Sequence, residues 1–240
     1  MRGFTLTELA VVLVIIGILM ASGVYTMSAQ VESRYRADTQ RRLDEAKDLL
    51  VGFALVHGRL PCPGIASGDE AGGGAAACAS PYGGFLPARA IGFQPTDAAG
   101  FALDAWGNRI RYAVSATAWG TAPARFTRQH AAAAPWSITQ TPGDLVVCSA
   151  SPGVASALAC DAGTSLTNQN TVVAVVFSTG KNGAAAPGGA NEARNLDANA
   201  LFVSRTPDPP SAAGGEFDDL VSWIPVGLLY GRMIAAGALP

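Results

Sequence analysis

The chain has 240 residues, of which 49% are hydrophobic and 14% are charged, and its formal net charge is −2. Because phosphates are neutralised by Lys and Arg, the lack of a basic excess disfavours general binding of nucleic acid. The hydrophobic fraction excludes a wholly disordered chain, and the length predicts one large domain or two small ones.

The apolar residues gather near the N-terminus. No residue between Glu8 and Glu32 is charged, which leaves 23 uncharged residues from Leu9 to Val31. About 20 apolar residues span a bilayer as a helix, so one membrane span is predicted. Arg2, on the N-terminal side, predicts that this end is cytoplasmic. A cleaved signal peptide is the alternative, and the short n-region and the carboxylate of Glu8 disfavour it.

Glu8 stands at the edge of this span, where a lone carboxylate is costly. No basic residue lies within one or two helical turns on its C-terminal side, and Arg2 is six residues back. Glu8 therefore needs a positive partner. That partner could be a new α-amino group, made by cutting the chain nearby, or a group of another subunit.

The segment Gly3-Phe4-Thr5-Leu6-Thr7-Glu8, followed by an uncharged apolar run, resembles the processing site of type IV pilins and type II secretion pseudopilins. The resemblance implies that a prepilin peptidase cuts between Gly3 and Phe4, and that the new N-terminus at Phe4 is methylated. It also implies that Glu8 pairs with the N-terminal amine of a neighbouring subunit during filament assembly. Such pairing makes physical sense, because opposite charges attract strongly in hydrocarbon and each alone is expensive.

Helical spacing continues beyond the apolar run. From Val31 to His57 apolar residues recur at helical intervals, and the opposite face carries ten charged residues. Gly58 suits the end of a helix. One helix is therefore predicted from Phe4 to about His57. After a short leader at residues 1–3, residues 4–30 would be the membrane and filament-core part, and residues 31–57 an amphipathic part that packs on a head.

Residues 58–240 are predicted to form one β-rich periplasmic head. An antiparallel sheet laid on the second half of the helix would bury the apolar residues of both. The expected fold class is therefore α+β, which is also the pilin-like fold that the resemblance implies. Residues 61 to 105 have few regular signals, and Gly227 to Ala236 suits a short terminal helix. The expected strands are Arg109 to Ser115, Leu145 to Ser149, Thr171 to Ser178, Leu201 to Ser204 and Leu220 to Ile224.

Three head segments resemble segments of pseudopilin heads. They are Leu103 to Asn108, Ser178 to Gly183 and Phe217 to Val221. The first has an aspartate, a tryptophan, a glycine and an asparagine before a strand, and its Gly107-Asn108 pair suits a turn.

Four cysteines, Cys62, Cys78, Cys148 and Cys160, allow three disulfide pairings. Pairing of sequence neighbours is preferred, because each bridge then closes a short loop, and an oxidising periplasm would favour both bridges. A zinc site is the weaker alternative. The sequence has no Cys-x-x-Cys, and neither histidine has a ligand-like spacing to these cysteines.

No catalytic arrangement is found, so the chain is predicted not to be an enzyme. There is no Gly-x-Ser-x-Gly motif, and Gly180-Lys181 lacks the spacing of a P-loop. No cofactor is predicted. The preferred interpretation of the acidic residues in the C-terminal loops is that they are solvated, with Asp218 or Asp219 capping a turn. A calcium ion is the alternative, because the resemblance implies it: major pseudopilins of type II secretion often hold one in these loops. The candidate calcium ligands are Glu192, Asp197, Asp218 and Asp219.

The resemblance implies a structural subunit of a type IV pilus-like or type II secretion pseudopilus filament. Expected partners are identical or related pilin subunits, the prepilin peptidase, an inner-membrane assembly platform and membrane lipid, but not nucleic acid. The chain is expected in the bacterial inner membrane before assembly, and in a periplasmic or cell-surface filament afterwards. The alternative is a membrane-anchored periplasmic domain that binds a ligand and never polymerises, for which Glu8 would be dispensable.

Overall fold

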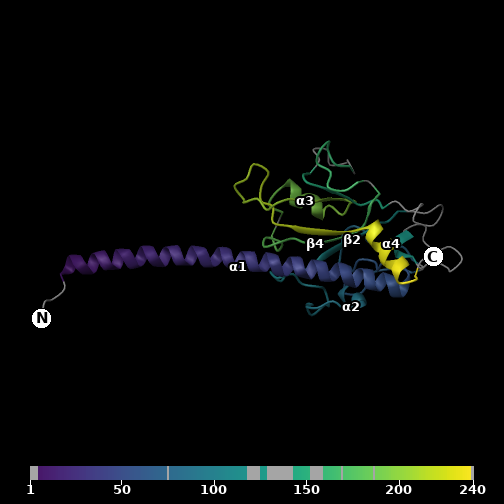
Figure 1. Ribbon diagram of the computed structural model, residues 1–240, viewed down its shortest axis with the longest axis horizontal. Coiled ribbons are helices and arrows are strands. Elements are labelled where there is room, and N and C mark those ends of the chain that lie inside the picture. Colours follow the sequence, from purple (N-terminus) through teal and green to yellow (C-terminus); the bar gives the residue numbers. More distant parts are fainter. Residues whose placement is uncertain are drawn as a thin grey trace.

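One long helix projects from a compact head in the computed structural model (Figure 1). The structure describes residues 5–74, 76–117, 125–128, 143–151, 159–168, 170–185 and 187–238. The helix, α1 (Leu6–His57), begins with a capping box in which Thr5 and Glu8 each accept a hydrogen bond from the other's backbone N–H. It ends at Gly58, whose φ of 63° is left-handed. The single helix predicted from the sequence is confirmed from Leu6 onward.

The main sheet of the head covers the second half of α1. It is antiparallel, with strand order β1 (Gly84–Phe85), β2 (Arg111–Val114), β4 (Val172–Ser178) and β6 (Leu220–Pro225). All seven residues of β4 are buried. From Ala174 to Phe177 its side chains alternate between the cluster that contains Leu50 of α1 and a second cluster on the far face of the sheet. A register shift lies between Val172 and Ala174. Burial on both faces explains why this strand is a continuous apolar run.

A second, smaller sheet corrects the expectation of one antiparallel sheet. Strands β3 (Val146–Cys148) and β5 (Leu201–Val203) pair in parallel and lie outside the main sheet. The chain between them contains β4 and α3 (Ala190–Leu196), so it is long enough for the crossover that a parallel pair requires. The pair buries a cluster of its own, formed with Phe217 and the cysteines of one disulfide.

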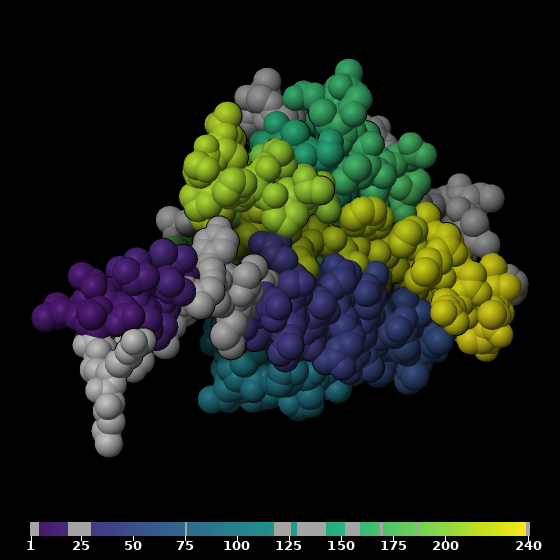
Figure 2. Space-filling model, turned by 60° about the vertical axis from the view of Figure 1, so that its left-hand side comes forward, coloured from purple at the N-terminus to yellow at the C-terminus, as the bar shows by residue number. Residues whose placement is uncertain are grey.

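Four further elements were not predicted as regular structure. The stretch expected as loop contains β1 and the short helix α2 (Ala88–Ile91), and α3 occupies a segment interpreted as a C-terminal loop. A 3₁₀ turn spans Arg125–Thr127. The predicted terminal helix is present as α4 (Val226–Ala235), which packs against the C-terminal part of α1 (Figure 2).

Both disulfides join sequence neighbours, as the loop lengths favoured. Cys62 pairs with Cys78 and Cys148 with Cys160, with Cα–Cα separations of 5.3 and 5.5 Å. Bridges across such short loops stabilise a fold mainly by restricting the unfolded chain, by roughly 2–4 kcal/mol each.

The first half of α1 stands clear of the head (Figure 1). Every side chain from Leu6 to Ile18 is exposed, and burial on α1 begins at Thr39 among the side chains that the structure describes. The predicted membrane span, residues 9–31, lies on α1, and the side chains of residues 19–29 are outside the described part. Within the described residues, no helix has an apolar stretch long enough to cross a membrane.

Substitution of Leu50 tests whether the stability of the head depends on its packing against α1. Its side chain is fully buried in the cluster between α1 and the sheet, so Leu50→Ala should lower the free energy of unfolding by roughly 2–5 kcal/mol. Val56, on the same helix, is 78% exposed, and Val56→Ala should change the free energy of unfolding by less than about 0.5 kcal/mol. Urea unfolding of the full chain in detergent measures both. Equal effects would contradict this account of the core.

Candidate functional site

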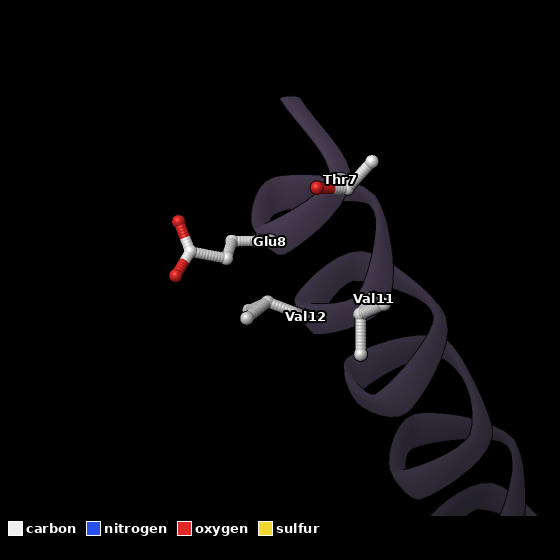
Figure 3. Close-up of a pocket in the computed structure, with 4 residues that line it drawn as sticks. All are labelled: Thr7, Glu8, Val11 and Val12. Atoms are coloured by element: carbon white, nitrogen blue, oxygen red, sulfur yellow. The ribbon is translucent and has the colours of Figure 1, made fainter. Parts of the chain in front are cut away.

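Glu8 and the bare apolar residues around it form the first candidate site. Thr7, Glu8, Val11 and Val12 line a shallow groove on α1, and the Glu8 carboxylate projects from the helix (Figure 3). Its Oε2 accepts hydrogen bonds from the backbone N–H and the hydroxyl of Thr5, both at 2.9 Å. No ion pair to Glu8 is found within the described chain. The predicted processing residues, Gly3 and Phe4, lie outside the described residues.

The second candidate site is a buried polar network in the head, where the three pseudopilin-like segments meet. This network, the polar junction, runs from α1 through the loop before β2 and the turn after β4 to α3 and the start of β6. Its members are Thr39, Arg42, Asp104, Asn108, Ser178, Asn182, Glu192, Asn195, Asp218 and Asp219.

The α1 side of the polar junction is a clamp on the loop before β2. Arg42 Nη1 donates to the carbonyls of Leu103 and Asp104, at 2.9 and 2.7 Å, and Thr39 Oγ1 accepts from the backbone N–H of Ala105 at 3.1 Å. The sequence pattern put Arg42 on a solvated helix face, and nothing in that pattern distinguishes it from the other arginines of α1. The structure shows that this arginine instead joins α1 to the head.

Asp104 organises this loop from within. Its Oδ1 accepts from the backbone N–H groups of Trp106 and Asn108, at 2.9 and 2.8 Å, and its Oδ2 accepts from Ser178 Oγ at 2.6 Å. Burial raises the pKa of Asp104, and these hydrogen bonds oppose the shift. The aspartate and asparagine of the pseudopilin-like segment therefore have a structural role, because they hold the loop in shape and tie it to the end of β4.

The turn after β4 continues the network. Asn108 Nδ2 donates to the Gly180 carbonyl at 2.6 Å, and Asp218 Oδ2 accepts from the backbone N–H groups of Lys181 and Asn182. Gly180 has a φ of 61°, and a Cβ there would lie 2.2 Å from Asp218 Oδ1, so only glycine fits this position. Asp218 thus caps a turn, which was one of the alternatives left open by the sequence.

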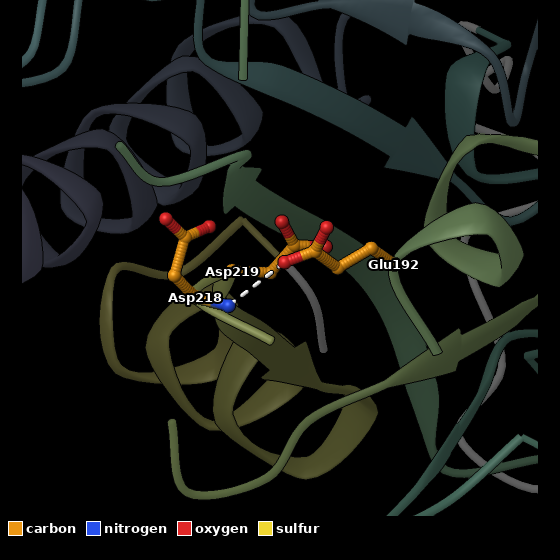
Figure 4. A group of neighbouring side chains, drawn as sticks. All are labelled: Glu192, Asp218 and Asp219. Atoms are coloured by element: carbon orange, nitrogen blue, oxygen red, sulfur yellow. Dashed lines mark hydrogen bonds between the residues drawn. The ribbon is translucent and has the colours of Figure 1, made fainter. Parts of the chain in front are cut away.

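Glu192 and Asn195 connect α3 to this turn and to β5. Glu192 accepts from the backbone N–H group of Asp218 at 2.9 Å (Figure 4). It also accepts from the backbone N–H group of Gly188 at 2.6 Å and from Asn182 Nδ2. Asn195 Nδ2 donates to Asp219 Oδ2 at 2.7 Å. Glu192, Asp218 and Asp219 are each 5% exposed or less, so the interpretation of these acids as solvated loop residues is wrong.

Proximity and burial disfavour full ionisation of these three acids. One carboxylate oxygen from each lies within 4.8 Å of the others. Burial, reinforced by the charge of Glu192, raises the pKa of Asp219 to about 8 and that of Asp218 to about 6, although hydrogen bonds to both carboxylates oppose the shift. At neutral pH Asp219 therefore keeps a proton, which reduces the repulsion within the polar junction.

The calcium prediction can be compared with this geometry. Three of the four candidate ligands come together, whereas Asp197 pairs with Arg194 at 3.0 Å and lies outside the group. Both oxygens of Glu192 already accept two N–H donors each. A cation bound by Glu192 would have to displace these donors, whereas Asp218 Oδ1 is buried and has no hydrogen-bond partner among the described residues.

Asp219 should make stability depend on pH. The folded chain, with a pKa of about 8, keeps a proton that the unfolded chain releases near the usual value of 3.8. The free energy of unfolding therefore falls as pH rises between these values. Asp219 should contribute up to about 1.4 kcal/mol per pH unit to the slope of the free energy of unfolding against pH, and we expect Asp219→Asn to remove this contribution. Urea unfolding at several pH values measures it, and exposed Asp161, changed to Asn, is the control. An unchanged slope in Asp219→Asn would contradict the assignment.

Calcium should leave the stability of the head unchanged. An ion present at about a hundred times its Kd adds about 2.7 kcal/mol of stability when it binds only the folded state. Because the Glu192 oxygens are occupied, we expect the same Tm in excess calcium and in EDTA. A rise in Tm that Glu192→Gln abolishes would restore the calcium site.

Comparison with known proteins gives one match. Residues 1–24 match the family model of the prokaryotic N-terminal methylation motif. No curated protein and no solved structure matches the chain. The matched residues include Gly3, Phe4 and Glu8 and continue into the bare part of α1. The chain thus carries, at the start of its long helix, the motif that is the hallmark of type IV pilins and pseudopilins.

Proposed function

We propose that the chain is a structural subunit of a type IV pilus-like or type II secretion pseudopilus filament and performs no reaction of its own. One observation carries the proposal: the methylation motif leads directly into a helix whose apolar side chains, from Leu6 to Ile18, contact nothing in the head. Exposed apolar residues on this scale mark a surface for lipid or for another protein. In a subunit that moves from membrane to filament, this surface would contact lipid first and other subunits afterwards.

Assembly then consists of packing the bare helices of many subunits against one another. Lipid tails are as apolar as these side chains, so close packing and polar pairing, rather than removal from water, would favour helix contacts over lipid. Glu8 supplies the polar pairing. Thr5 occupies only Oε2 of its carboxylate, which leaves Oε1 to accept from the ammonium of another subunit.

Processing creates that ammonium. A prepilin peptidase would cut between Gly3 and Phe4 and methylate Phe4, whose amine would then stand beside the N-cap residue Thr5. Every subunit would carry a cation and the Glu8 carboxylate at the same end of α1. The pair is favourable only when both charges are buried together, because an unpaired charge in hydrocarbon is strongly disfavoured. Each new subunit is thereby guided to one axial position.

Glu8→Ala should block assembly but not processing. The carboxylate is the pairing group, whereas the cut lies on the other side of Phe4. We expect at least about a tenfold loss of filaments, since about 1.4 kcal/mol of lost pairing is already tenfold in association. Electron microscopy and the yield of sheared filaments measure this loss. Unreduced intact mass should show, in wild type and variant, the loss of Met1–Gly3, one added methyl group and two disulfides.

Glu45→Ala is the matched control, because Glu45 is an exposed glutamate on the same helix, far from the processing site. It should be cut and should assemble as the wild type does. Wild-type filament yields from Glu8→Ala would contradict the pairing role of Glu8. A mass that still includes Met1–Gly3 in the wild type would support the anchored, non-polymerising domain instead.

A further inference from the structure

Two aromatic side chains lie together where α1 leaves the head. The rings of Tyr35 and Trp106 meet edge to face, with centroids 6.1 Å apart and an interplanar angle of 76°. Tyr35 is 43% exposed and Trp106 is half-buried. Tyr35 precedes Thr39, where burial on α1 begins among the described side chains, so the pair lies where α1 enters the head.

The polar junction holds this pair in a fixed place. Trp106 belongs to the loop that Asp104 organises and that Arg42 and Thr39 attach to α1. Because this loop is attached to α1, the position of Trp106 along α1 is fixed relative to Tyr35. The Trp106 Nε1 donor is buried and finds no acceptor among the described residues, so it is not the part of the indole that can meet a lipid.

The spacing along α1 matches the thickness of a membrane. From Glu8 to Tyr35 the helix rises about 40 Å at 1.5 Å per residue. A bilayer with its headgroup layers is about 40–45 Å thick. When Glu8 lies at the inner boundary of the bilayer, Tyr35 and Trp106 lie in the headgroup layer of the opposite face. Tyr and Trp are the residues enriched at that depth, because one part of each ring is apolar and the other is polar.

The nearby charges do not oppose such a contact. On α1, Glu32 pairs with Arg36 and Asp38 pairs with Arg41 and Arg42, and Asp104 of the Trp106 loop is buried and held by hydrogen bonds. Arg34 is exposed and makes no ion pair with another described residue. An exposed arginine without an ion-pair partner attracts anionic headgroups.

We propose that Tyr35 and Trp106 form a lipid-contacting surface that seats the base of the head in the headgroup layer of the membrane before assembly. This inference rests on the proposed membrane anchoring of α1 and adds the site at which the head itself touches lipid. Ester and phosphate oxygens at this depth supply acceptors for the Tyr35 hydroxyl. The contact is broken when the subunit leaves the bilayer for a filament.

The test uses the full chain in vesicles of phosphatidylethanolamine with a minority of phosphatidylglycerol, some lipids carrying a spin label on the headgroup. One variant keeps only Trp106, with Trp119, Trp136 and Trp223 changed to Phe. The control keeps only Trp223, which lies on β6 and packs in the second core cluster. We expect the label to quench Trp106 fluorescence at least about twofold more than that of Trp223. Flotation of the vesicles is measured on the same samples.

The outcomes separate the two proposals. A chain that floats with the vesicles but shows equal quenching of Trp106 and Trp223 would overturn the lipid contact and leave the anchoring intact. A chain that does not float would overturn the anchoring and the contact together. Shielding of Trp106 that increases with the number of chains per vesicle, without quenching by the label, would assign this surface to a second copy and would also overturn the proposal.

Discussion

The structure depends on the packing of the second half of α1 under the main sheet. Leu43, Ala46 and Leu50 are fully buried there, and they join residues of β4, β6 and α4 in one cluster. Helices of ordinary composition owe most of their stability to such packing rather than to propensity. The first half of α1 has no such support within the chain, and its helix continues from the packed half. The head thus holds in shape a helix whose free part serves contacts outside the subunit.

The polar junction decides where along α1 the head is attached. Here the apolar packing is joined by directional bonds, from Arg42 to the carbonyls of Leu103 and Asp104. Buried polar groups contribute little net stability and cost much when they lose their partners, so a shifted head would be disfavoured. Protonation of Asp219 completes the network, because it lets three acids share one buried space without a cation.

The long helix, its glycine end, the five strands and both disulfide pairings could be predicted from the sequence, because each leaves a local signal. The rest depended on contacts between distant residues. Helix α3 has seven residues and few apolar ones, and it is held by the bonds of Glu192 and Asn195 rather than by its own propensity. The parallel pairing of β3 with β5 has no sequence pattern at all. Glu192 and Asp218 were predicted as calcium ligands on the correct observation of clustered acids, but the N–H donors that occupy them come from three separate segments.

One rigid element connects the two candidate sites. Glu8 and Thr39 lie on the same unbroken helix, about 47 Å apart at 1.5 Å per residue. If pairing at Glu8 sets the axial position of each subunit, the helix and the Arg42 clamp transmit that position to the head without a flexible joint. Contacts between neighbouring heads would then be fixed by a charge pair at the far end of α1. If α1 anchors the chain in a membrane, the same rigidity would set the height of Tyr35 and Trp106 there, so one helix length would serve first to seat the head on lipid and later to place it in a filament.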